Sequence, residues 1–132
     1  MAGPIDVLVL DDEEVVCERL KSSLEKKDYL VETFTESQKA LDRLSQKRFD
    51  VVITDVKMKG PTGLDVLHFI KRQDPGTQVI IITGYGSMEN IREAEYGGAF
   101  EFINKPFTSS AMEDLVRRAA KKARKLDGKA ER

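Results

Sequence analysis

The chain has 132 residues, 40% hydrophobic and 34% charged, with a formal net charge of −1. This length suits one domain, and the nearly balanced charge gives no general attraction to nucleic acid or to a membrane surface. A single cysteine (Cys17) excludes an intramolecular disulfide, and a single histidine (His68) argues against a zinc site. Because no apolar stretch is long enough to span a membrane and residues 1–4 are no signal peptide, we expect a cytoplasmic protein.

Five strand-like runs alternate with helix-like stretches along the chain. The runs are rich in β-branched and aromatic residues, and they predict strands over 5–10, 29–34, 49–54, 78–82 and 100–104. Apolar periodicity and turn residues predict helices over about 13–27, from 37 onward, from 64 to a stop at 74–76, over 88–96, and from 109 onward. Thr35-Glu36-Ser37 supplies an expected N-cap for the second helix.

The apolar positions of the helices predict which of their faces are buried. In the first helix the expected buried stripe consists of Val15, Val16, Leu20 and Leu24. In the third helix it consists of Leu64, Val66, Leu67 and Ile70. Cys17 is interpreted as an ordinary small helix residue, and His68 as a residue on the flank of its stripe.

This alternation predicts an α/β fold with a doubly wound, five-stranded parallel sheet of the flavodoxin-like order 2-1-3-4-5. The second strand alternates more than the others, as an edge strand does. In such a sheet, ligands bind beyond the carboxyl ends of the strands, where the strand order reverses. The reactive side chains that end successive strands are Asp11, Asp12, Asp55, Thr83 and Lys105.

Three carboxylates in one crevice repel each other and need a cation. All-oxygen ligands with open positions suit Mg²⁺. Asp55 is the candidate nucleophile for a phosphoryl group, whose charge Lys105 and the metal would neutralise and to which Thr83 can donate. The alternative is that the acidic pair caps the first helix and that Asp55 and Lys105 are ordinary solvated residues.

Four stretches of the chain resemble the receiver domain of two-component response regulators, most closely the receivers of NtrC-type transcriptional activators. They are VLVLDDEEVV, FDVVITDVKMKGPTGLDVL, VIIITGYGSMENI and GGAFEFINKPFT. The resemblance implies that Asp55 is the phosphoacceptor and that Asp11, Asp12 and the Lys57 carbonyl hold Mg²⁺ with it. It further implies that Thr83 is the switch hydroxyl, Lys105 the charge partner, and Phe102 an aromatic switch whose alternative is ordinary strand packing.

The loop after Asp55 departs from the common family wording. Receivers often have Met-Pro-Gly-Met-Asp-Gly there, whereas this chain has Met58-Lys59-Gly60-Pro61-Thr62-Gly63. Gly84 follows Thr83 where the family often has alanine, and the extra backbone freedom of glycine should loosen that loop.

The expected function is a phosphorylation-dependent switch that accepts a phosphoryl group from a sensor histidine kinase onto Asp55. The receiver is expected over residues 5–122, after a tail at 1–4 and before a helix extension or linker at 123–132. Two other classes are a degenerate receiver acting as a constitutive interaction module and an aspartate-nucleophile phosphohydrolase. The second would need an acid two residues after the nucleophile, where the chain has Lys57.

The last helix predicts a homodimer. Its heptad-like seam consists of Met112, Val116, Ala119, Ala123 and Leu126. The seam is longer than one domain needs to cover its sheet. The family implies that activation changes the face formed by the 88–96 helix, the 100–104 strand and this last helix, so we expect a weak homodimer there that phosphorylation strengthens. The alternative is a helix that frays into a basic tail.

Overall fold

The computed structural model describes residues 3–84, 92 and 97–130 of the chain. Five parallel strands form one sheet in the order β2-β1-β3-β4-β5, as predicted. Their bounds are Asp6–Leu10 (β1), Leu30–Phe34 (β2), Val51–Asp55 (β3), Gln78–Thr83 (β4) and Glu101–Asn104 (β5). The helices are α1 (Glu14–Glu25), α2 (Ser37–Gln46), α3 (Gly63–Gln73) and α5 (Ser109–Ala130). Apart from residue 92, the helix predicted over residues 88–96 lies outside the described residues.

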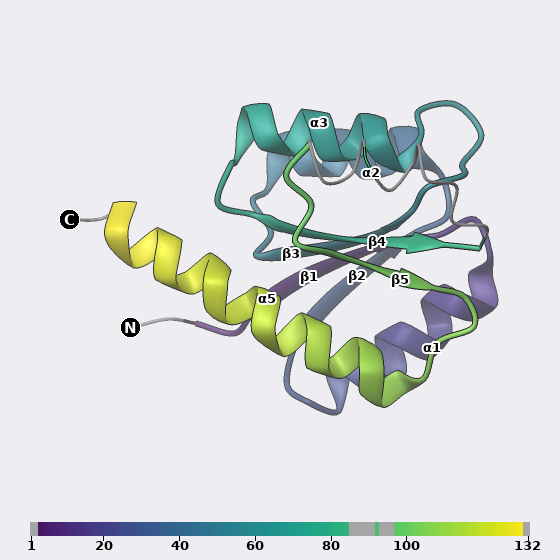
Figure 1. The fold of residues 1–132 in the computed structure, drawn as a ribbon, viewed down its shortest axis with the longest axis horizontal. Helices are drawn as coiled ribbons and strands as arrows, with labels where there is room; N and C mark the ends of the chain where they lie inside the picture. The colour runs from purple at the N-terminus through teal and green to yellow at the C-terminus, as the bar shows by residue number, and fades with distance from the viewer. Residues whose placement is uncertain (1–2, 85–91, 93–96, 131–132) are drawn as a thin grey trace.

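Helices cover both faces of the sheet (Figure 1). Strands β1, β3 and β4 are almost fully buried because α1 and α5 cover one face and α2 and α3 the other. Leu30 on β2 is 52% exposed, as expected for the edge of the sheet. The alternation of side chains along each strand therefore divides the core into two apolar layers.

The predicted buried stripe of α1 was partly wrong. Val15 is 70% exposed, and the buried positions of the helix are Cys17, Leu20 and Leu24. The Cys17 thiol lies against the backbone where β1 and β2 end, 3.4 Å from the Asp11 carbonyl oxygen and 3.6 Å from that of Phe34. A thiol can donate weakly to these carbonyl groups, which a valine side chain cannot. The predicted stripe of α3 is confirmed, since all four of its residues are buried.

The start of α2 falls within the stretch predicted to supply its N-cap. The N-cap of α2 is Glu36, and it makes no side-chain capping hydrogen bond. Ser37 instead donates from its hydroxyl to the Lys59 carbonyl, at 3.0 Å, and so ties α2 to the loop after β3. That loop ends in a capping box at the start of α3, where Thr62 and Asp65 each accept a hydrogen bond from the other's backbone N–H.

Four of the five residues of the seam predicted on α5 belong to the core of the domain, and the fifth, Leu126, is partly buried. Met112, Val116, Ala119 and Ala123 are all fully buried, because α5 lies along the sheet face that it shares with α1 (Figure 1). The interpretation of this seam as a dimer interface was therefore wrong.

Contact between α5 and the rest of the domain continues past residue 122. The guanidinium of Arg124 donates two hydrogen bonds to Asp50, each 3.1 Å long, and a third of 2.8 Å to the Pro4 carbonyl. Whether the receiver ends at residue 122 stays a prediction. Among the described helices, none is both long enough and apolar enough to cross a membrane.

Candidate functional site

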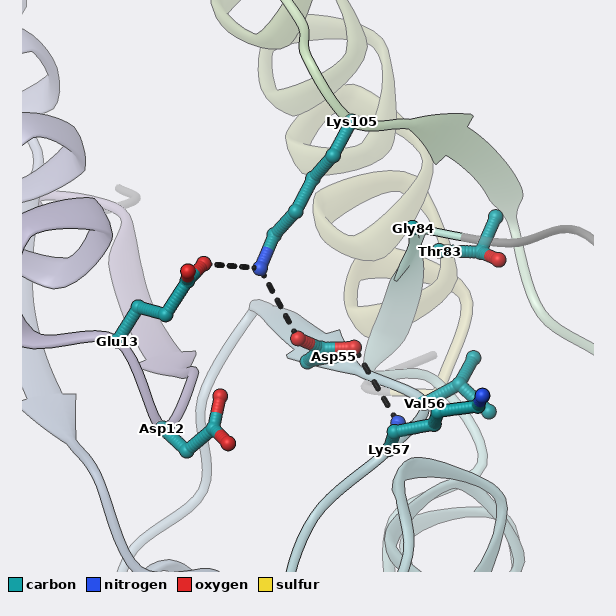
Figure 2. A pocket seen from close by; sticks show the side chains of 8 residues that line it. All are labelled: Asp12, Glu13, Asp55, Val56, Lys57, Thr83, Gly84 and Lys105. Carbon is teal, nitrogen blue, oxygen red and sulfur yellow. Dashed lines mark hydrogen bonds and ion pairs between the residues drawn. The ribbon is translucent and has the colours of Figure 1, made fainter.

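A crevice at the carboxyl ends of the strands brings together most of the predicted site residues. Its volume is about 280 Å³, and its lining residues are Asp12, Glu13, Asp55, Val56, Lys57, Thr83, Gly84 and Lys105. Asp55 is the last residue of β3, while Asp11 directly follows β1 and Lys105 directly follows β5. The parallel topology therefore gathers side chains that lie far apart in the sequence (Figure 2).

The ammonium group of Lys105 is shared among three carboxylates. Its Nζ lies 3.0 Å from Asp55 Oδ2, 3.0 Å from Asp11 Oδ2 and 2.7 Å from Glu13 Oε2. The side chain extends across the crevice to reach these oxygens (Figure 2). The peptide bond between Lys105 and Pro106 is cis, and the Lys105 N–H donates to the Thr83 carbonyl at 2.9 Å.

Glu13 is the member of this cluster that was not predicted. Residue 13 was interpreted only as the start of the first helix, yet its side chain makes the shortest of the three contacts with Lys105. The available signal was its position directly after an acidic pair that ends a strand. A residue there is the N-cap of the helix, and its carboxylate faces the same crevice as the pair.

Burial and ion pairing shift the pKa values of this cluster. Burial raises the pKa of Asp11 above its ordinary value of 3.8, although the Glu13 N–H and Lys105 offset part of that effect. Burial by itself would lower the pKa of Lys105, but its bonds to Glu13, Asp11 and Asp55 outweigh burial and raise it above 10.5. The hydrogen bond from Lys105 lowers the pKa of Glu13. At neutral pH the lysine is therefore firmly charged.

Asp55 is held rigidly from the side opposite to Lys105. Its Oδ1 accepts a hydrogen bond of 3.2 Å from the Lys57 backbone N–H, and its carboxylate is largely buried. Gly63, the first residue of α3, packs directly on the Asp55 backbone, so that a Cβ at this position would lie 2.1 Å from the Asp55 carbonyl oxygen. Only glycine fits there, which explains why Gly63 is needed despite the altered loop before it.

The two predicted switch residues occupy neighbouring strands. Thr83 ends β4 and is buried, and its side chain extends away from the Asp55 carboxylate (Figure 2). Phe102 lies on β5 beside Ile81, and its ring is partly buried against the apolar layer that α2 and α3 cover. This packing is that of an ordinary strand aromatic, and a switch role for either residue stays a prediction.

The acidic cluster fits a divalent metal. One carboxylate oxygen from each of Asp11, Asp12 and Asp55 can be chosen so that all lie within 4.8 Å of one another. Asp11 Oδ2 is buried, and apart from its ion pair with Lys105 it has no aligned hydrogen bond among the described residues. Hard oxygen donors, one solvent-exposed side and a shortage of positive charge match the preferences of Mg²⁺.

Comparison with known proteins identifies the family. The profile of the response regulator receiver domain matches residues 7–117, and the chain belongs to this family. It is similar to a putative NtrX-like response regulator of Rickettsia typhi, 36% identical over 117 residues, which cover 87% of this chain and 25% of that protein. The chain thus spans about a quarter of the length of this curated relative.

Solved receiver structures agree with this assignment. A response regulator receiver domain protein of Clostridium thermocellum superposes with a TM-score of 0.86 at 35% identity, covering 92% of this chain and 98% of that one. The beryllofluoride-activated NtrC4 receiver domain dimer gives a TM-score of 0.84 at 33% identity, with coverages of 89% and 98%. The chain is a receiver domain of the two-component type, most like those of NtrC-type regulators, and such domains are signalling switches and not classical enzymes.

Proposed function

We propose that this receiver is switched by transfer of a phosphoryl group from a phosphohistidine of a sensor kinase to Asp55. The observation that carries the proposal is the position of the Asp55 carboxylate, which faces Lys105 Nζ at 3.0 Å and borders the acidic pair at the open edge of the sheet. Asp11 shares the lysine partner and the acidic cluster, but its side chain is fully buried, whereas Asp55 lines the crevice.

In the proposed reaction a carboxylate oxygen of Asp55 attacks phosphorus. The new O–P bond replaces the P–N bond of phosphohistidine, and the electron pair of that bond returns to the imidazole nitrogen. Lys105 donates to the oxygens of the transferred group and compensates their charge. Mg²⁺, held by Asp11, Asp12, Asp55 and the Lys57 carbonyl, would supply further positive charge to these oxygens. The Lys57 backbone N–H holds the remaining Asp55 oxygen in place.

The proposed output is a change at the face that includes β5 and α5. Thr83 would turn its hydroxyl toward the phosphoryl group, and Phe102 would change rotamer and so alter the surface beside it. A homodimer that phosphorylation strengthens belongs to the same proposal. It would have to use exposed residues of this face, because four of the five seam residues of α5 are already buried in the domain.

Phosphorylation with a small acyl phosphate and Mg²⁺ tests the assignment. Intact-protein mass spectrometry should detect one added phosphoryl group in the wild type and in Asp42→Asn, a control at an exposed aspartate outside the crevice. The Asp55→Asn variant keeps the side-chain shape but removes the nucleophilic carboxylate, and it should remain unlabelled. Equal labelling of that variant would overturn the assignment. No labelling of the wild type would favour a constitutive interaction module, and continuous release of phosphate a phosphohydrolase.

A further inference from the structure

Glu13 occupies a special place among the partners of Lys105. Its side chain is 57% exposed, while that of Asp11 is fully buried and that of Asp55 is 10% exposed. An ammonium group has three N–H donors. Lys105 donates hydrogen bonds to Glu13 and Asp55, and it forms an ion pair with Asp11 that has no aligned hydrogen bond. A phosphoryl oxygen that binds the ammonium therefore competes with these carboxylates.

Glu13 is the partner that can release Lys105 at the lowest cost. A largely exposed carboxylate regains water when its ion pair breaks, whereas a buried one such as that of Asp11 does not. Glu13 also lies at the border of the crevice (Figure 2). Its negative charge there would repel an anion that enters the crevice.

We infer that Glu13 is a positioning residue that holds the Lys105 ammonium in the unphosphorylated state and so competes with the phosphoryl group for it. The inference rests on the proposed phosphorylation of Asp55. Glu13 restrains the switch, because Lys105 has to weaken its bond to this carboxylate as it turns toward the phosphoryl oxygens.

The side chain of Glu13 is not needed to start α1. Glu13 is the N-cap residue of that helix, but its side chain makes no capping hydrogen bond. Residue 13 also has a backbone link to the acidic cluster, because its N–H donates to Asp11 Oδ1 at 2.8 Å. A Glu13→Gln substitution keeps this N–H and the side-chain size and removes only the charge that binds Lys105.

Binding of beryllofluoride, a stable phosphoryl mimic, tests the inference at saturating Mg²⁺ and fixed ionic strength. Glu13→Gln should bind the mimic about threefold to fivefold more tightly than the wild type, as expected for the loss of one largely exposed competing ion pair. The matched control is Glu14→Gln, which removes the same charge from the neighbouring exposed residue. Its affinity should stay within about twofold of the wild type, because Glu14 makes no contact with Lys105.

A Glu13→Asp variant separates positioning from simple charge repulsion. Its shorter side chain keeps the negative charge but draws the carboxylate back from Lys105 Nζ, so binding should be at least about twofold tighter than in the wild type. The inference is overturned if Glu13→Gln binds within twofold of the wild type, if Glu14→Gln tightens binding equally, or if Glu13→Asp behaves like the wild type. A wild type that does not bind the mimic at all would instead contradict the proposed function.

Discussion

The two ends of the sheet both hold buried aspartates, but their charges are compensated to different degrees. At the amino end, Asp50 accepts hydrogen bonds from the Asp6 backbone N–H at 2.9 Å and twice from Arg124. At the carboxyl end, Asp11 and Asp55 share one ammonium group with Glu13, and Asp11 Oδ2 lacks an aligned hydrogen bond among the described residues. Full compensation stabilises the fold, whereas the charge left over at the carboxyl end is available to a ligand.

The largest expected effect concerns the main-chain packing of the carboxyl end. Gly63→Ala should lower the free energy of unfolding by about 3 kcal/mol or more, because the new methyl carbon would lie 2.1 Å from the Asp55 carbonyl oxygen. The matched control is Gly84→Ala, where no described atom lies within 4 Å of the added carbon, and its unfolding free energy should be nearly unchanged. Urea unfolding measures both variants, and equal stability of the two would contradict this account.

The second largest effect is expected at the amino end of the sheet, where Arg124 balances the charge of Asp50. Asp50→Asn should destabilise the fold by about 2–4 kcal/mol, because the neutral amide leaves the Arg124 guanidinium without its counter-charge and offers one acceptor oxygen in place of two. Urea unfolding at neutral pH measures the change. A variant as stable as the wild type would mean that the bonds between Arg124 and Asp50 contribute little.

An aspartate-to-asparagine substitution at the carboxyl end of the sheet should raise the free energy of unfolding, whereas Asp50→Asn lowers it. Without divalent metal at pH 7.5, Asp11→Asn should be more stable than the wild type by about 1–2 kcal/mol, because it removes a buried and poorly compensated charge. Burial raises the pKa of Asp11 in the folded state, so its ionisation costs stability as the pH rises above 3.8 through the folded-state pKa. The advantage of the variant should therefore shrink in urea unfolding as the pH falls toward 4. A variant less stable than the wild type at pH 7.5 would contradict the comparison.

The smallest effect concerns a compensated pair near the surface. Glu32 accepts two hydrogen bonds from Arg43, at 2.8 and 3.0 Å, and this pairing lowers the pKa of Glu32. Its contribution is present above pH 4.5 and is lost as the pH falls through the lower folded-state pKa. Glu32→Gln should lower the melting temperature by only about 1–2 °C at pH 7, since solvent screens the pair, and by less at pH 3.5. A pH dependence of the opposite sign would show that the carboxylate is destabilising.

The order of the strands and the place of the site could be predicted from sequence because both depend on strand ends. Apolar runs that finish in Asp11, Asp55, Thr83 and Lys105 bring these residues to one edge in any parallel sheet. The rotation of α1 was predicted only in part. The buried residues Cys17, Leu20 and Leu24 fall at helical spacings of three and four, but Val15 and Val16 offered a competing apolar choice and Cys17 was interpreted as an ordinary small residue. Whether the α5 seam is buried in the domain or exposed depends on how much of the helix packs on the sheet. The sequence of the helix alone does not determine this.

The ion pair of Glu13 could not be predicted from the sequence. In the sequence, Glu13 resembles any exposed acidic residue at a helix start, whose charge normally interacts with the helix dipole. Only the three-dimensional structure reveals that Lys105, 92 positions later in the chain, reaches it. Long-range ion pairs of this kind depend on side-chain reach across a crevice. The local sequence could indicate that residue 13 borders the crevice, but not that it binds Lys105.

The close fit of Gly63 against Asp55 makes the two walls of the crevice unequal in stiffness. The wall formed by β3 and the start of α3 is in direct backbone contact, so Asp55, the proposed phosphoacceptor, has no room to move back from a bulky dianion attached to it. The other wall presents the long side chain of Lys105 and the rotatable hydroxyl of Thr83. We therefore expect the structural changes that follow phosphorylation to occur on the side of β4 and β5, and the wall at β3 and α3 to stay in place.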